Sequence, residues 1–226
     1  LGIQLLTSMS KHVRKYFKNH KLIKLLEFPV LFLGATPQNT PAMYSMMNYA
    51  DLVLGTWYPQ GGMHQIVKAM VSLAESHGIN IKLNTEVTAI DVKNEKAGEI
   101  HTTKGTFTAD VIISGADYEH TDQRLIPAAS RNYTPQYWDS RTMSPSSLLF
   151  YVGVNKRVNN IEHHNLFFDE DFELHAREIY TDPKWPTKPL FYVSCASKTD
   201  NMVAPEGCEN LFFLMPLAPG LQDDDT

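Results

Sequence analysis

The sequence predicts a mixed α/β (α+β) fold, and three observations support this prediction. Helical and strand-like patterns alternate along the first half of the chain. Strand candidates beyond Pro145 follow one another as in an antiparallel sheet, with one helical segment between them. Of the 226 residues, 43% are hydrophobic and 20% are charged, which is ordinary for a folded protein and argues against disorder.

Composition narrows the class of protein further. The net charge of −5 excludes a broadly basic nucleic-acid binder. No stretch approaches the roughly 18 uninterrupted apolar residues that a membrane span needs. The two cysteines, Cys195 and Cys208, have the spacing of neither a metal site nor a redox motif, which indicates a reducing compartment. We therefore expect a cytoplasmic protein with no nucleic-acid partner.

The two ends of the chain look like cuts. It begins at Leu1 without a methionine and ends at Thr226 directly after a strand-like run. We interpret it as an internal fragment, so the lack of a signal peptide says nothing about localisation.

The first 27 residues are predicted to form a helix with a one-sided basic face. An apolar run over residues 28–33 follows it. A basic amphipathic segment beside an apolar one is typical of a helix on an anionic membrane surface. A solvated basic face on a buried helix gives the same pattern, so the residues alone leave both interpretations open. The basic side chains are Lys11, Arg14, Lys15, Lys18, Lys21 and Lys24.

The most regular pattern begins with a turn at residues 58–63. Residues 64–77 have one apolar helical face, and Gly78 follows where a left-handed C-cap is expected. Residues 79–84 alternate apolar and polar, which predicts a strand with one buried face. Residues 85–92 continue in extended conformation.

A small hairpin and a buried strand come next. Residues 94–98 are predicted to turn, and residues 100–103 and 107–109 to pair as a hairpin about Lys104-Gly105. Residues 110–117 are predicted to form a short buried strand that ends in small residues.

Four strand candidates and one helix complete the chain. The strands are predicted at residues 147–154, 165–168, 190–196 and 210–217, and the helix at 171–180. These spacings predict a mostly antiparallel sheet with a helix on one face. Such an arrangement suits a substrate-binding domain, although the fold does not dictate the function.

Two places would let a ligand approach the backbone closely. Gly61 and Gly62 precede a helix, whose free N–H groups and partial positive charge favour an anionic ligand. Ser114, Gly115 and Ala116 follow the predicted buried strand, as small residues do beside a cofactor. A flexible helix start and a sheet turn without a ligand give the same two patterns.

His163-His164 is the one pair that suggests a metal. Adjacent residues on a strand point to opposite faces, and no third ligand is placed to help, so we expect no metal site. No nucleophile elbow and no acid–base pair stand out, and the catalytic residues stay unassigned. Aromatic residues are numerous in the strands, where they line either a β-core or a long apolar tunnel: Trp57, Tyr58, Phe150, Tyr151, Phe191, Tyr192, Phe212 and Phe213.

Two blocks of residues resemble the phytoene desaturases and related carotenoid dehydrogenases of the bacterial, FAD-dependent type. The first block contains Tyr58-Pro59-Gln60-Gly61-Gly62-Met63, Leu83-Asn84-Thr85-Glu86-Val87 and Ala109-Asp110-Val111-Ile112-Ile113-Ser114-Gly115-Ala116-Asp117. The second contains His163-His164-Asn165-Leu166-Phe167-Phe168, Ser197-Lys198-Thr199-Asp200, Ala204-Pro205-Glu206-Gly207 and Glu209-Asn210-Leu211-Phe212. Amine oxidases and protoporphyrinogen oxidases share the first block loosely, whereas the second is more particular to carotenoid desaturases.

The resemblance implies part of a two-dinucleotide-binding-type FAD flavoprotein with an antiparallel-sheet-plus-helix substrate domain. It implies that residues 1–57 are a helical substrate- or membrane-facing part, residues 58–121 the centre of the FAD-binding domain, and residues 122–226 the substrate-binding domain. The family's G-x-G-x-x-G turn and its closing Gly-Asp segment do not occur among these residues, so the chain holds a minority of the cofactor contacts. The implied contacts are Glu86 and Val87 near the adenine, Ser114, Gly115 and Ala116 on the same sheet, and Gly61 and Gly62 nearer the isoalloxazine.

The activity implied by the resemblance is desaturation of a carotenoid precursor such as phytoene. A hydride passes to the flavin and a proton leaves the neighbouring carbon, and the electrons go on to a quinone or to oxygen. Because the substrate is insoluble in water, we expect peripheral membrane association, which favours the membrane interpretation of the basic helix.

Three alternatives remain open. A related flavoenzyme acts on a hydroxylated carotenoid or a retinoid and shares these motifs. A more distant flavin oxidase of amines or porphyrinogens explains the first block only. A non-catalytic lipid-binding module on the membrane surface needs no flavin.

Overall fold

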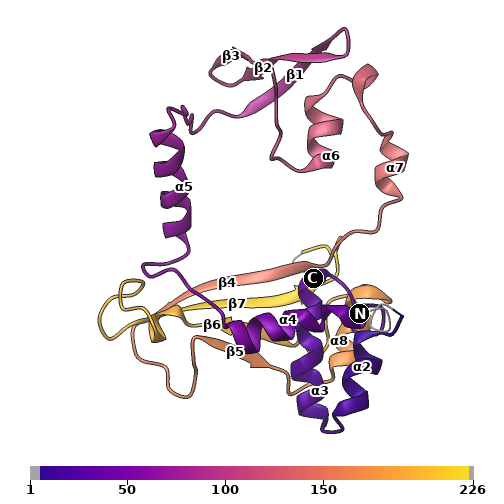
Figure 1. Cartoon of the computed structure of the whole chain (residues 1–226), viewed down its shortest axis with the longest axis vertical. Coiled ribbons are helices and arrows are strands. Elements are labelled where there is room, and N and C mark those ends of the chain that lie inside the picture. The colour runs from indigo at the N-terminus through magenta and orange to yellow at the C-terminus, as the bar shows by residue number, and fades with distance from the viewer. Residues whose placement is uncertain (1–5, 224–226) are drawn as a thin grey trace. The chain divides into compact units, whose positions relative to one another are not determined.

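The computed structural model describes residues 6–223, apart from the side chains of residues 31 and 32, and it divides into two compact units (Figure 1). The first unit combines Leu1–Met70 with Ser144–Thr226, and the second is Val71–Met143. Helix α5, His64–Ser76, crosses the boundary between them.

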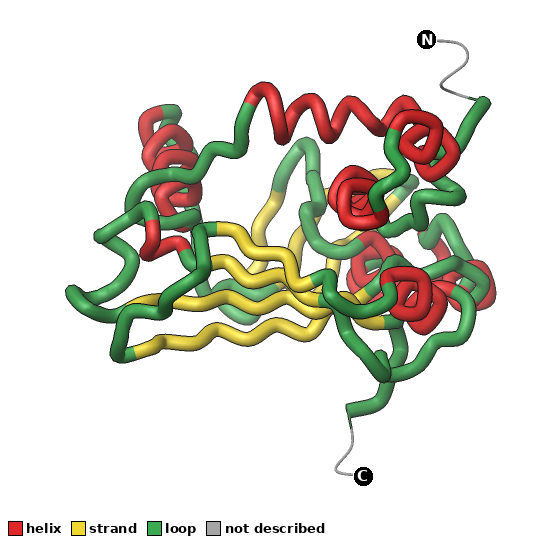
Figure 2. Tube along the Cα trace, turned by 90° about the horizontal axis from the view of Figure 1, so that it is seen from below, coloured by secondary structure: helices red, strands yellow, loops and turns green. Residues whose placement is uncertain are grey.

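A four-stranded antiparallel sheet is the centre of the first unit, and its strands lie side by side in Figure 2. The strand order is β4-β7-β6-β5, which confirms the predicted antiparallel sheet. β4 and β7 pair along their whole length, from Ser146 opposite Leu217 to Val154 opposite Glu209. The strands are β4 Ser146–Val154, β5 His164–Phe167, β6 Phe191–Ser194 and β7 Glu209–Leu217.

Helix α8, Phe172–Tyr180, packs against this sheet, as predicted. Asp171 caps it, because the carboxylate accepts a hydrogen bond of 2.9 Å from the backbone N–H of Glu173. Phe172, His175 and Ile179 recur at helical spacing and are buried. The helix therefore turns one face towards the strands.

The prediction of one helix over the first 27 residues is wrong. Two helices, α2 Met9–Tyr16 and α3 His20–Glu27, form a hairpin (Figure 1), and residues 1–5 lie outside the described part of the chain. Phe17 is extended and ends α2. Asn19 then caps α3, since its side chain accepts a hydrogen bond of 2.9 Å from the backbone N–H of Lys21. The asparagine side chain satisfies a free N–H group at the start of α3, which favours a new helix start at this position over one continuous helix.

The helical hairpin has its own small core. Met9, Val13, Ile23 and Val30 are buried together, with Leu26 and Tyr44 packed at the edge. An isolated β-bridge between Ser8 and Pro41 holds the segment around Pro41 against the residue that precedes α2. The short elements of this unit are the 3₁₀ turns Phe28–Leu33, Ala42–Ser45 and Ala196–Lys198, helix α4 Met46–Tyr49, and the π-helical turn Ala50–Leu54.

Helix α5 ends as predicted, with Gly78 at a φ of 73°. The strand predicted over residues 79–84 is wrong. Ile79, Ile81 and Leu83 are exposed, and no described strand pairs with them. A segment with an alternating pattern forms a strand only where a neighbouring strand supplies partners for its backbone N–H and C=O groups.

The second unit contains a three-stranded antiparallel meander in the order β1-β2-β3. The hairpin about Lys104-Gly105 is confirmed. The turn predicted over residues 94–98 is shorter: Asn94 and Glu95 take positive φ angles of 52° and 61°, and β2 starts at the next residue. The elements are β1 Val87–Lys93, β2 Lys96–Thr102, β3 Gly105–Thr108, helices α6 Tyr118–His120 and α7 Pro135–Asp139, the π-helical turn Thr121–Leu125 and the 3₁₀ turn Ala128–Ser130.

Buried Asp122 organises the segment after the meander. Its carboxylate accepts hydrogen bonds from the Asn132 backbone N–H at 2.9 Å, from Trp138 Nε1 at 3.2 Å and from Gln123 Nε2 at 2.7 Å. Burial opposes ionisation, but these donors outweigh it and hold the pKa of Asp122 below its usual value. The rings that pack around this segment are Tyr118, Tyr133, Tyr137 and Trp138.

Candidate functional site

The turn at residues 58–63 is tied to a distant part of the first unit. The Gly61 backbone N–H donates a hydrogen bond of 2.6 Å to Asp200 Oδ2, and the Met202 N–H donates one of 2.9 Å to Oδ1. Asp200 is buried. The carboxylate therefore joins the Gly-Gly turn to the loop after β6.

The backbone conformation of this turn requires glycine. Gly61 has a φ of 85° and Gly62 a φ of 94°, in the left-handed region. A Cβ on Gly61 would lie 2.8 Å from Gln65 Nε2. A Cβ on Gly62 would lie 3.5 Å from Val203 Cγ1 and 3.7 Å from Tyr58 Oη. The turn therefore keeps its backbone bare beside Tyr58.

Replacing Gly61 with alanine is expected to lower the free energy of unfolding by about 1–2 kcal/mol, because an L-residue resists the left-handed conformation. Urea denaturation of the full-length protein measures the change. Gly153→Ala is the matched control, since a Cβ there meets nothing within 4 Å and the φ is not positive. Equal stability of the two variants would contradict the prediction.

His163 and His164 lie beside this turn, and their rings stack at 4.3 Å with an interplanar angle of 23°. The expectation that they point to opposite faces is wrong, because His163 precedes β5 and is free of its alternation. Tyr58 contacts the His163 ring edge-on at 4.7 Å. His163 Nδ1 bonds Thr199 Oγ1 at 2.6 Å. Burial, reinforced by His164, lowers the pKa of His163, so the ring is neutral at pH 7.

An apolar cavity of about 330 Å³ lies between α8 and the sheet. Buried His175 stands in its wall with both ring nitrogens occupied: Nδ1 accepts from the Leu190 N–H at 3.1 Å, and Nε2 bonds the Pro216 carbonyl at 3.0 Å. Tyr192 also lines the cavity, and its hydroxyl bonds His164 Nδ1 at 2.5 Å. Apolar lining residues include Phe28, Leu33, Leu166, Phe168, Phe172, Ala176, Ile179, Leu190, Phe191 and Leu214.

Glu209 anchors the start of β7 inside the protein. Its Oε1 lies 2.7 Å from Lys198 Nζ and 3.5 Å from Arg157 Nη1, and its Oε2 accepts a hydrogen bond of 3.1 Å from the Val158 N–H. Burial opposes ionisation, but the bonds from Lys198 and Val158 outweigh it and lower the pKa of Glu209. The Lys198 and Glu209 positions of the second block are therefore partners in one buried ion pair.

The other sequence-predicted cofactor contacts belong to the second unit. Glu86 and Val87 lead into β1, and Thr103 bonds both the N–H and the carbonyl of Glu86. Ser114 Oγ bonds Thr121 Oγ1 at 2.8 Å and accepts from the Ala116 N–H at 3.3 Å. Gly61 and Gly62 belong to the first unit.

The buried strand predicted over residues 110–117 is wrong. Val111 is 75% and Ile113 is 89% exposed, and no ladder includes them in the described part of the chain. A Cβ on Gly115 would meet nothing within 4 Å. This segment therefore combines exposed apolar side chains with a glycine that has open space around its Cβ position.

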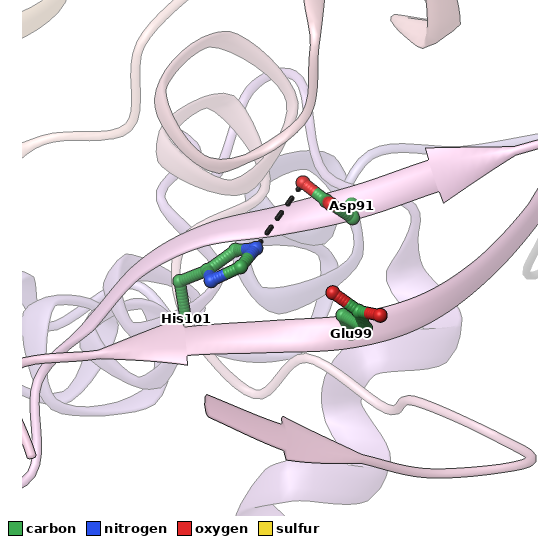
Figure 3. Close-up of side chains that lie close together, drawn as sticks. All are labelled: Asp91, Glu99 and His101. Carbon is green, nitrogen blue, oxygen red and sulfur yellow. Dashed lines mark ion pairs between the residues drawn. The ribbon is translucent and has the colours of Figure 1, made fainter. Parts of the chain in front are cut away.

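One further cluster lies on the meander (Figure 3). Asp91 on β1 stands opposite Glu99 on β2, and His101 shares their face. His101 Nε2 pairs with Asp91 at 3.3 Å, and His101 Nδ1 bonds Thr106 Oγ1 at 3.2 Å. Both ring nitrogens thus have protein partners, and the half-exposed cluster is a set of side-chain contacts on the surface of the meander.

Comparison with known proteins decides the family. A model of the flavin containing amine oxidoreductases matches residues 3–201. The chain belongs to this family. An oxidoreductase from Methanosarcina mazei has the same fold, with a TM-score of 0.65 and 17% identity over 94% of this chain and 48% of its own. A protein from Pyrococcus furiosus gives a TM-score of 0.63 and 15% identity, over 95% and 50%. The predicted flavoprotein fold class is confirmed, and flavin is the cofactor of the family.

The similar curated proteins are carotenoid enzymes, which confirms the resemblance. A carotenoid 3,4-desaturase of Haloarcula japonica is 40% identical over 100% of this chain and 46% of its own length. A 1-hydroxycarotenoid 3,4-desaturase of a Flavobacterium species is 33% identical over 91% and 41%. A phytoene desaturase of Fusarium fujikuroi is 31% identical over 99% and 39%. The flavoprotein chain thus spans less than half the length of these relatives.

Sequence reasoning missed the roles of Asp200, His163 and Tyr192. Asp200 was named only as part of a motif, His163 as half of a candidate metal pair, and Tyr192 as one aromatic among many. Their partners are Gly61, Thr199 and His164. Two of these three contacts span large sequence separations that periodicity does not reveal, and the third joins two different strands.

Proposed function

We propose that the full-length protein is an FAD-dependent desaturase that introduces conjugated double bonds into a carotenoid precursor. The observation that carries the proposal is the apolar cavity between α8 and the sheet, which the strand register connects to the Gly-Gly turn. The names of the similar curated proteins support the substrate class.

The continuation follows from the strand register. Leu166 stands opposite Tyr192, and His164 stands opposite Ser194, roughly 7 Å further along β5. The Cys195 N–H then bonds the His163 carbonyl at 2.8 Å. His163 contacts Tyr58 at the Gly-Gly turn. A linear ligand in the cavity would therefore point one end at this turn.

The residues of the chain would position the substrate and exclude water from it. The cavity wall would hold the polyene away from water, and neutral His163 adds no charge beside the Gly-Gly turn. A bound flavin would supply the hydride acceptor for the dehydrogenation. The proposed FAD contacts are Gly61, Gly62, Glu86, Val87, Ser114, Gly115 and Ala116. A quinone or oxygen would receive the electrons.

The helical hairpin would dock the cytoplasmic protein on the membrane. None of the described helices is long and apolar enough to cross a bilayer. Tyr16, Phe17, Leu22 and Leu25 are exposed around the hairpin loop, beside exposed lysines. Lys24 is committed elsewhere, because its Nζ donates to the Phe168 and Glu170 carbonyls. Lys18 Nζ donates to the Arg14 carbonyl within the hairpin itself. The exposed lysines that would meet lipid headgroups are Lys11, Lys15, Lys18 and Lys21.

The variant Lys15→Glu/Lys18→Glu/Lys21→Glu is expected to bind anionic liposomes at least about a hundredfold more weakly in low salt. Each basic residue near such a surface contributes about 1 kcal/mol, and the new acids repel it. Liposome co-sedimentation of the full-length protein measures the loss. Lys68→Glu/Lys93→Glu/Lys96→Glu is the matched control, because it makes the same change of charge at other exposed sites. Unchanged binding of the hairpin variant would sink the docking model.

The desaturase proposal is tested by the visible spectrum of the full-length protein purified in detergent. A flavin band, with FAD identified after release, and conversion of added polyene are the expected results. A colourless protein that takes up no added FAD would overturn the proposal and leave a lipid-binding module. Bound FAD with turnover of amines alone would instead point to the wider family.

A further inference from the structure

Tyr192 is the polar group that the cavity wall presents nearest to the Gly-Gly turn. His175 has both nitrogens occupied within the protein. The serines of the wall, Ser144, Ser146 and Ser147, lie at the other end, where Ser146 stands opposite Leu217 and Ser147 opposite Pro216. Tyr192 is opposite Leu214, nearer the β6 end that leads to His163.

The Tyr192 hydroxyl keeps hydrogen-bonding capacity for a ligand. A phenol oxygen has one proton to donate and two lone pairs to accept with. Its bond of 2.5 Å to His164 Nδ1 uses one of these. If Tyr192 donates, both lone pairs stay free; if His164 donates, one lone pair and the proton stay free. In either tautomer the oxygen can accept a hydrogen bond from a ligand hydroxyl.

We infer that Tyr192, oriented by His164, forms a hydroxyl-recognition subsite in the cavity. The inference rests on the proposed function and refines it: the preferred substrate is a polyene with a hydroxyl near one end. A hydrocarbon would cover the phenol oxygen without replacing its lost water, which weakens binding. The hydroxyl end would lie towards Gly61 and Gly62, and the tail towards Phe28 and Leu33.

The test compares two ligands on the full-length protein: an acyclic polyene hydrocarbon and the same polyene with one terminal hydroxyl. Quenching of protein fluorescence gives each Kd without any turnover. The wild type is expected to bind the hydroxylated polyene about tenfold more tightly. Tyr192→Phe should bring the ratio close to one while hydrocarbon binding stays within about twofold, because the ring remains.

Tyr180→Phe is the matched control, since it removes the same oxygen from α8 outside the cavity lining. His164→Phe removes the partner that orients Tyr192 and should reduce the preference at least about threefold. This second variant decides the matter if Tyr192→Phe fails to fold. Preference kept in both variants, or a wild type that does not discriminate, overturns the subsite. Equal binding with flavin-dependent desaturation would overturn the subsite alone, whereas failure to bind either polyene or FAD would overturn the proposed function as well.

Discussion

Replacing Glu209 with alanine is expected to lower the free energy of unfolding by about 3–5 kcal/mol. Removing one partner of a buried ion pair leaves the other charge uncompensated. Lys198 would lose a carboxylate 2.7 Å from its Nζ while its side chain is 21% exposed, so water restores only part of the lost interaction. The Val158 N–H would lose its acceptor as well. Urea denaturation of the full-length protein measures the effect.

Glu206→Ala controls for the loss of a carboxylate from the same segment. Glu206 is exposed, so its removal should change stability by less than about 0.5 kcal/mol. The pH dependence gives a second check. Because the folded pKa of Glu209 is lowered, its contribution is complete above the unfolded pKa of about 4.3 and disappears as the pH falls through the folded pKa. The gap between wild type and Glu209→Ala should be constant above about pH 5 and shrink in acid. A gap that widens in acid would refute this role.

In the second unit, Asp122→Ala is expected to cost about 2–4 kcal/mol, since three donors lose a buried charged acceptor. Trp138 reports the change directly, because its indole N–H would lose the carboxylate. Urea denaturation followed by tryptophan emission measures both the shift in midpoint and the altered native spectrum.

Asp139→Ala is the matched control for that variant. Asp139 is exposed at the end of α7, in the same segment as Trp138, and accepts none of the three hydrogen bonds. It should leave the midpoint and the emission unchanged. Equal effects of the two substitutions would mean that Asp122 does not organise the segment.

The sequence predicted those elements whose signals are local. The strands of the four-stranded sheet, helices α5 and α8 and the Lys104-Gly105 hairpin follow from period, capping and turn residues, and all are present. The strand predictions for residues 79–84 and 110–117 failed for one shared reason. A strand depends on a neighbouring strand that its own residues do not specify. The break at Asn19 was readable, because asparagine before a helical run is an N-cap signal.

The residues of the candidate site were likewise predictable only where the signal is local. Gly61 and Gly62 were identified because two glycines before a helix leave the backbone open to a ligand, and the structure gives both a positive φ. The partner Asp200 was quoted without a role, since a loop carboxylate has no periodicity to place it. The burial that keeps His163 neutral is likewise a property of packing, which composition does not encode.

The anchoring of Glu209 also constrains the length of β7. Side chains on a strand alternate between faces, so Leu214 and Pro216 reach the cavity while Phe213 and Met215 face away. With Glu209 held by Lys198, one inserted residue between Glu209 and Leu214 would exchange these two sets and place two bulky side chains in the cavity. Natural variants of this segment should therefore tolerate substitutions far better than insertions or deletions, and any length change that survives should come in pairs of residues.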